Sequence, residues 1–235
     1  MGNLRELKKE LRAVADTERA RINMSFFKTG KGEYGEGDRF LGLAVGDMRK
    51  IAKKHRDFPF DDIEKLLTSK WHEERFTGLI ILVNRFGKAD VKGKGEVYRF
   101  YLKNIKAVNN WDLVDTTTPQ IIGEYLAERP RDILFRFAKS RNLWKRRIAI
   151  LATFAFIRRG DFDDTLRIAD ILLDDKHDLI HKAVGWMLRE VGNRSAVAEE
   201  RFLKPRYKKM PRTMLRYAIE KFPEEKRKAY LAGTI

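Results

Sequence analysis

The 235-residue chain contains no cysteine, which excludes disulfide bonds, thiolate zinc sites and cysteine nucleophiles. No uncharged apolar run approaches the ~18 residues of a membrane-spanning helix, so we expect no membrane partner. The first residues show no apolar signal region, and Glu6 stands where a myristoylation site has Ser or Thr. These absences favour a cytoplasmic protein, nucleoid-associated if the host is bacterial.

Acidic residues are scarce relative to basic ones. Lys and Arg total 50 against 34 Asp and Glu, which gives a formal charge of +16. Such an excess favours a polyanionic partner, and nucleic acid is the leading candidate. The apolar share of 43% is large enough for a folded core. We expect one domain over residues 1–235, active as a monomer.

Apolar residues recur at three- and four-residue steps through most of the chain. Leu4, Leu7 and Leu11 predict a first amphipathic helix. Four glycines within residues 29–38 predict an ordered loop.

Further helical patterns continue to the end of the sequence. We expect breaks between them at Pro130, Gly160 and Pro211, and over Lys92–Gly95. No segment alternates in the manner of a strand, so the predicted fold class is all-α.

The expected helices come in pairs. The second members begin near His72, Trp111, Leu143, Asp178 and Pro211, at steps of 39, 32, 35 and 33 residues. A period in the thirties with two helices per unit is typical of helical solenoids such as HEAT and TPR arrays. We therefore predict a curved solenoid of HEAT-like helix pairs, with the second helices lining a concave groove.

Two long stretches contain several basic residues and no acidic one. Residues 133–160 hold eight lysines and arginines, and residues 202–219 hold six. One interpretation is a basic groove that follows DNA phosphates, because each neutralised phosphate adds salt-sensitive affinity. The alternatives are a solvated helix face and an acidic protein partner. The residues that we expect to contact DNA in these stretches are Lys145, Arg146, Arg147, Arg212 and Arg216.

An indole and a carboxylate share one face of the expected helix that begins near Trp111. Trp111 and Asp115 are four residues apart, so their side chains project together. Trp186 lies on another second helix, and Arg147 lies on the one between them. Each residue also has a simpler interpretation: a core tryptophan, an acid that complements a helix N-terminus, or a solvated arginine.

Histidine offers a competing idea. His177 and His181 are four residues apart, but Asp178 replaces the glutamate of the HExxH motif and no third ligand is evident. We expect no metal and no cofactor.

Six short stretches, taken together, resemble the AlkD-type DNA alkylation-repair glycosylases, which are built of HEAT-like repeats. The resemblance covers essentially the whole chain. The stretches are FFKTG at 26–30, YGEGDRFLG at 34–42, NWDLVD at 110–115, WKRR at 144–147, KAVGWMLRE at 182–190 and RTMLRYAIEK at 212–221. The chain departs from the family pattern at Gly46, where members often have proline, and at Asn110, where some have tryptophan.

The resemblance implies a role for each candidate residue. Asp115 is the catalytic carboxylate, Trp111 and Trp186 are aromatic walls of the lesion site, and Arg147 contacts the DNA backbone. The implied reaction is release of cationic purines such as N3-methyladenine and N7-methylguanine from double-stranded DNA, without strand cleavage, as the first step of base excision repair. The alternatives are a non-catalytic HEAT-repeat DNA-binding protein of the same family and a protein-binding scaffold.

Overall fold

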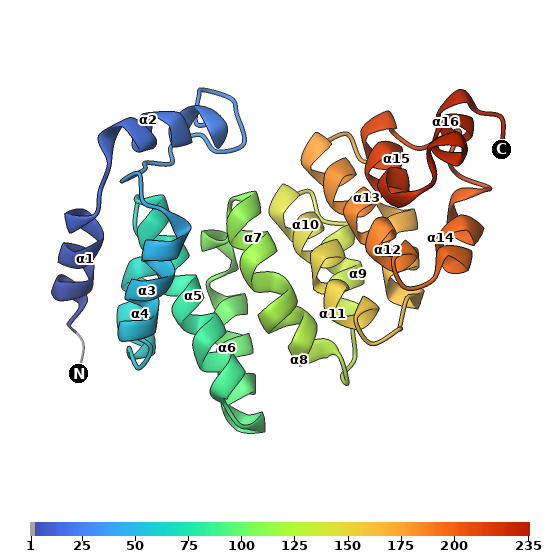
Figure 1. Ribbon diagram of the computed structural model, residues 1–235. Coiled ribbons are helices and arrows are strands. Elements are labelled where there is room, and N and C mark those ends of the chain that lie inside the picture. Colours follow the sequence, from blue (N-terminus) through green and yellow to red (C-terminus); the bar gives the residue numbers. More distant parts are fainter. Residues whose placement is uncertain (1–2) are drawn as a thin grey trace. The chain divides into compact units, whose positions relative to one another are not determined.

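The computed structural model describes residues 3–235, which divide into two compact units. The first extends through Thr117, and the second spans Thr118–Ile235. Helices follow one another in both units (Figure 1), and the described residues form no strand beyond an isolated bridge between Arg39 and Trp71. The predicted all-α class is confirmed. No helix within 3–235 has both the length and the apolar character to cross a bilayer.

The first unit is organised around its longest helix, α5 (His72–Lys88), which packs against α1, α3, α4 and α6. The other elements are α1 (Leu4–Ala13), α2 (Thr17–Phe26), α3 (Val45–Lys54), α4 (Phe60–Leu67), α6 (Val91–Lys103), the 3-10 turn η1 (Ile105–Ala107) and α7 (Trp111–Thr118). Leu7 and Leu11 of the predicted first helix are fully buried. The amphipathic pattern at the start of the chain thus marks a helix that packs on the core.

The second unit is organised around α13 (Asp178–Gly192), which packs against α10, α12, α14 and α15. Its other elements are the π-helix η2 (Pro119–Gly123), α8 (Glu124–Leu126), α9 (Asp132–Ala138), α10 (Leu143–Ala152), α11 (Phe154–Ile157), α12 (Asp163–Ile171), α14 (Ala196–Leu203), α15 (Arg212–Ala218), the 3-10 turn η3 (Ile219–Lys221) and α16 (Glu224–Ala232). Gly185 lets α13 approach α15 closely, because a Cβ there would lie 2.4 Å from the Met214 carbonyl oxygen.

The predicted starts of the second helices agree with the structure. Helices α5, α7, α10 and α13 begin at the four predicted residues, and Pro211 is the N-cap of α15. Within the pairs, α4 packs on α5, α9 on α10 and α12 on α13. The helix-pair spacing is therefore confirmed. The curvature of the array and its concave basic groove stay predictions.

The expected break over Lys92–Gly95 is wrong. These residues form the first turns of α6, whose N-cap Asp90 accepts a hydrogen bond from the Gly93 amide at 2.8 Å. Each glycine costs a helix about 1 kcal/mol relative to alanine, but the cap and the burial of Gly95 and Val97 offset that cost. Gly46, which stands where family members often have proline, is the second residue of α3, and this helix begins at Val45 without a side-chain cap.

Candidate functional site

A pocket of about 370 Å³ opens in the first unit, and it contains Trp111 and Asp115. Both residues belong to α7, one turn apart, as their spacing predicts. The remaining walls come from the C-terminal end of α2, from the segment 27–43 that follows it, from the start of α3 and from α5. The structure therefore brings the predicted indole and carboxylate together in one cavity.

Aromatic rings hold Trp111 in place. The Phe27 ring stacks on the indole with centroids 5.2 Å apart and planes 14° apart, and the Phe26 ring meets it edge-on at 5.7 Å. Phe27 also stacks on Phe40 at 5.0 Å. Phe26 is nevertheless 60% exposed, so this ring stands at the mouth of the pocket. The indole is thus a wall with one face already covered by Phe27.

A chain of charged groups is centred on His72, the first residue of α5, which itself lines the pocket. The His72 Nε2 is 2.7 Å from a carboxylate oxygen of Asp112, and its Nδ1 is 3.1 Å from one of Asp38. Arg75 donates a hydrogen bond to the other oxygen of Asp38. Burial disfavours the charged imidazole, but the two carboxylates outweigh it and raise the pKa of His72 to about 9.

Asp38 completes the same network from the loop. Its carboxyl is buried, which by itself would raise its pKa, yet the bonds from His72 and Arg75 hold that pKa below its ordinary value. Asn110 also donates to Asp38, at 3.4 Å, and accepts from the Trp111 amide at 2.8 Å. The departure from the family pattern at Asn110 therefore places an amide that links the loop to the start of α7.

A second buried acid, Glu73, fixes the segment that closes the pocket. Its carboxylate accepts hydrogen bonds from the backbone amides of Leu41, Gly42 and Leu43, at 2.9, 2.8 and 3.3 Å. Gly42 is needed here because its φ is +83° and a Cβ would lie 1.9 Å from the Asp16 carbonyl oxygen. Sequence reasoning missed Glu73, His72 and Asp38 as site residues. The signals were the polar run His-Glu-Glu-Arg at a helix start, which is also typical of a solvated first turn, and the position of Asp38 within the family-like stretch 34–42.

The second unit contains the other candidate residues. Trp186 lies on α13, where its indole N–H donates to Glu190 at 3.2 Å and its ring centroid lies 6.0 Å from that of Phe154. Its side chain is half-buried. The role of Trp186 as a lesion wall stays a prediction.

Arg147 is buried, with 4% of its surface exposed, and its guanidinium donates to the backbone carbonyl of Leu179. This bond uses one of the five guanidinium N–H donors, so a phosphate contact depends on whether the phosphate can reach the remaining N–H groups of a buried side chain. Lys145 is half-buried, with its ammonium 5.6 Å from the Phe137 ring centroid. Arg212 and Arg216, on α15, are exposed.

In the folded protein, several basic residues of the two acid-free stretches are paired with acidic residues from elsewhere in the chain. Arg146 pairs with Asp175 at 2.6 Å, although Asp175 lies outside the acid-free stretch 133–160. Arg159 and Arg206 are likewise paired, with Glu124 and Asp170. The basic residues of the two stretches are therefore less available to phosphate than their number indicates.

The histidine pair at the start of α13, where His177 is the N-cap, makes local backbone contacts. The Leu179 amide donates to His177 Nδ1 at 3.2 Å, and the His181 Nε2 is bonded to the Asp175 carbonyl. In residues 3–235, no three histidine or carboxylate groups are placed to share a metal ion.

Comparisons with known proteins agree with this architecture. A sequence model of the DNA alkylation repair enzyme family matches residues 7–222. A search of curated proteins returns no match. A solved structure described as a predicted DNA alkylation repair enzyme from Enterococcus faecalis is 15% identical, with a TM-score of 0.71 over 89% of this chain and 97% of that one.

Two solved structures from Streptococcus mutans are also similar. AlkD2 is 18% identical, with a TM-score of 0.55 over 94% of this chain and 97% of its own. The protein smu.31 is 16% identical, with a TM-score of 0.54 over 94% of this chain and 99% of its own. At these identities the likeness shows a shared fold.

Proposed function

The chain belongs to the DNA alkylation repair enzyme family, and on that premise we propose that it is a DNA glycosylase for cationic alkylated purines in duplex DNA. Its substrates are N3-methyladenine and N7-methylguanine, and it hydrolyses the N-glycosidic bond without cutting the strand. The observation that carries this proposal is the pocket that contains both Asp115 and the Trp111 ring.

Release of such a base requires a negatively charged carboxylate near the sugar and does not require a proton donor. A methylated purine that already carries a positive charge leaves the sugar without being protonated first. As its bond to C1′ stretches, positive charge develops on the sugar, and the carboxylate of Asp115 stabilises that charge. Water then adds to C1′ and loses a proton, and the base departs neutral. Asp115 orients this water and accepts its proton.

Asp112 is the competing carboxylate, since it also lines the pocket. One of its oxygens is bonded to His72 at 2.7 Å, and the other accepts the Leu113 amide at 2.8 Å. The charge of Asp112 is therefore directed at the imidazole of His72. This arrangement favours Asp115 as the group that faces the sugar.

The dimensions and walls of the pocket suit a purine. About 370 Å³ lies at the lower end of the usual range for small-ligand sites. The Trp111 indole can attract a cationic base through its π-face, by roughly 0.5 to 2 kcal/mol depending on desolvation. Trp186 of the second unit is proposed to bind the lesion as well.

Affinity for the duplex is proposed to come from basic residues of the second unit. Lys145, Arg212 and Arg216 are at least partly exposed, whereas Arg146 is paired with Asp175 and Arg147 is buried. We expect the first three to make most of the phosphate contacts, and we expect the affinity to fall steeply with salt.

A base-release assay on three matched duplexes tests the function. One carries N7-methylguanine, one carries uracil and one is undamaged. The proposal predicts release of N7-methylguanine alone, because the site assists only a cationic leaving group. Equal release of uracil contradicts the mechanism. Binding to all three duplexes without release identifies a non-catalytic DNA-binding relative, and absence of both binding and release leaves a protein scaffold.

A further inference from the structure

His72 joins three segments of the first unit that are distant in sequence. It begins α5, it contacts Asp38 in the loop after α2, and it contacts Asp112 in the first turn of α7. Only 3% of its side chain is exposed, and the two carboxylates are 7% and 16% exposed. Solvent therefore cannot readily replace either partner of the imidazole.

Both ring nitrogens of His72 face carboxylate oxygens, so both must donate. Only the protonated ring has two N–H groups. The raised pKa of about 9 agrees with this geometry, although burial opposes it. His72 is thus an imidazolium at neutral pH.

The other groups around this ring support the charged form. Arg75, also on α5, binds Asp38 and not the imidazole, and Asn110 donates to Asp38 from the residue before α7. Phe40 stacks on the imidazole at 4.6 Å and Phe27 lies at 5.1 Å, so π-faces cover the cation. Glu73, next to His72 on α5, is bound to the backbone amides of the 41–43 segment.

We propose that His72 is a positioning residue of the base-removal site: its doubly bonded imidazolium ties the first turn of α7 to α5 and to the loop, and so sets Trp111 and Asp115. The inference rests on the proposed function. Asp112 and Trp111 are adjacent in sequence, so a shift of Asp112 moves the indole directly. Asp115 follows one turn later on the same helix.

Deprotonation of the His72 imidazolium removes one of its two bonds to carboxylates. A neutral imidazole has a single N–H, so one of its two carboxylates loses that donor. Asp38 keeps its bonds from Arg75 and Asn110. Asp112 keeps the Leu113 amide and no cationic partner among the described residues, so Asp112 is the carboxylate that moves toward water when it loses the donor. The start of α7 then moves with it, and a displacement of about 1 Å can cost up to ~10²-fold in rate.

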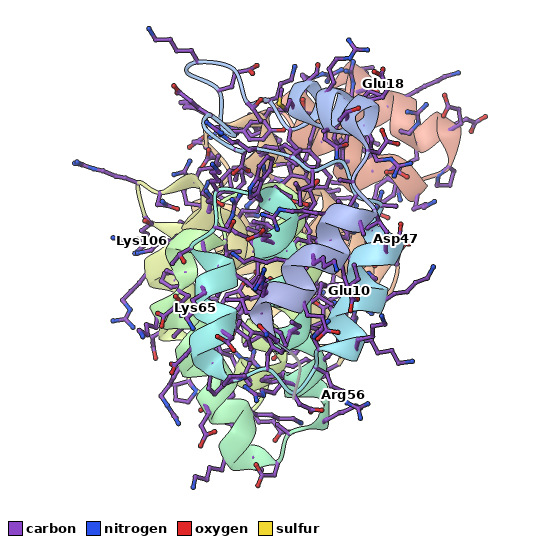
Figure 2. The ribbon with its side chains drawn as sticks, turned by 90° about the vertical axis from the view of Figure 1, so that its left-hand side faces the viewer. Glu10, Glu18, Asp47, Arg56, Lys65 and Lys106 are labelled. Atoms are coloured by element: carbon purple, nitrogen blue, oxygen red, sulfur yellow. The ribbon has the colours of Figure 1, made fainter. Side chains whose placement is uncertain are left out.

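His72→Gln tests this role, because glutamine keeps one donor and removes the charge. The assay is single-turnover release of N7-methylguanine with excess enzyme, followed between pH 7 and pH 10, together with duplex affinity. The matched control is His55→Gln. His55 is a buried histidine of the same unit, 5% exposed, and its Nε2 is 3.3 Å from Glu10. Glu10, labelled in Figure 2, lies on α1, which contributes no residue to the pocket lining.

In the wild-type protein, the rate is expected to fall as pH rises through about 9. His72→Gln is expected to be about tenfold slower at pH 7, to lose the alkaline limb, and to bind duplex as the wild type does. His55→Gln is expected to match the wild type in rate and pH profile. A His72→Gln protein with the parental rate and the parental alkaline limb overturns the inference.

A second measurement tests the role of His72 independently of the proposed glycosylase activity. The imidazole of His72 can be titrated by NMR in the protein without DNA, in the wild type and in Asp112→Asn. A titration midpoint near pH 9 in the wild type that is lower in Asp112→Asn supports the proposed link between His72 and α7. A midpoint at the ordinary value for histidine in both proteins overturns it. If the wild type releases no base, the proposed glycosylase activity fails, and this titration still decides whether His72 holds α7.

Discussion

Glu199→Gln is expected to stabilise the protein at alkaline pH and to leave it nearly unchanged at acidic pH. Glu199, on α14, is 2% exposed, and its Oε1 has no hydrogen-bond partner among the described residues. Burial raises its pKa from an ordinary 4.5 to about 8, and the neighbouring Glu200 adds to the effect. Lys226 and Arg189 lower it only in part. The folded protein therefore keeps this carboxyl protonated near neutral pH.

The sign of the pH dependence follows from that raised pKa. Between pH 4.5 and pH 8 the unfolded chain has lost the proton and the folded protein still holds it, so stability falls as pH rises. At 1.36 kcal/mol per pKa unit, the loss amounts to about 5 kcal/mol at most. Glutamine has the same shape but does not titrate, so the variant escapes this loss.

Urea unfolding at pH 5 and pH 9, at constant ionic strength, measures the effect. We expect the two proteins to differ little at pH 5, and we expect the variant to be more stable by a few kcal/mol at pH 9. His72 and the other titrating groups contribute equally to both proteins. The same substitution at Glu225, which is exposed on α16, serves as the control. A difference between Glu199→Gln and wild type that does not change with pH refutes the reasoning.

Two further predictions concern the second unit. Lys145→Ala should weaken binding to damaged and undamaged duplex alike and reduce the slope of log affinity against log salt by about one, and an unchanged slope argues against a phosphate contact. Gly185→Ala should cost about 1–3 kcal/mol in urea unfolding, because its Cβ would lie 2.4 Å from the Met214 carbonyl oxygen and 2.5 Å from the Tyr217 Cβ. Gly87→Ala, on α5 with open space around it, should be neutral or stabilising, and equal losses in both variants would contradict the packing argument.

The elements that the sequence predicts well are those decided by local pattern. Apolar periodicity and a capping residue are both local, so the starts of α5, α7, α10 and α13 are readable from the chain alone. Asn142, for example, caps α10 by accepting the Lys145 amide at 3.0 Å. The relation between Trp111 and Asp115 is predictable for the same reason, since it depends only on helical spacing.

The elements that the sequence does not predict depend on distant partners. His72 meets Asp38 and Asp112, which lie 34 and 40 residues away, and no local pattern pairs them. The same holds for Arg146, whose partner Asp175 is 29 residues away. Counting basic residues along the chain therefore overstated the charge available to DNA. The expected break in α6 failed differently, because burial of Gly95 outweighs glycine's low helix propensity.

The most direct test of the account is the rate of N7-methylguanine release by Asp115→Asn in a single-turnover assay with excess enzyme. Asparagine keeps the shape and removes the charge that is proposed to face the sugar. We predict a loss of roughly 10²- to 10³-fold, or about 2.7 to 4 kcal/mol, with duplex affinity unchanged. Asp112→Asn, which removes one of the two negative charges that face His72, should lose less. Release by Asp115→Asn at the parental rate would contradict the account, and a larger loss in Asp112→Asn would move the catalytic role to that residue.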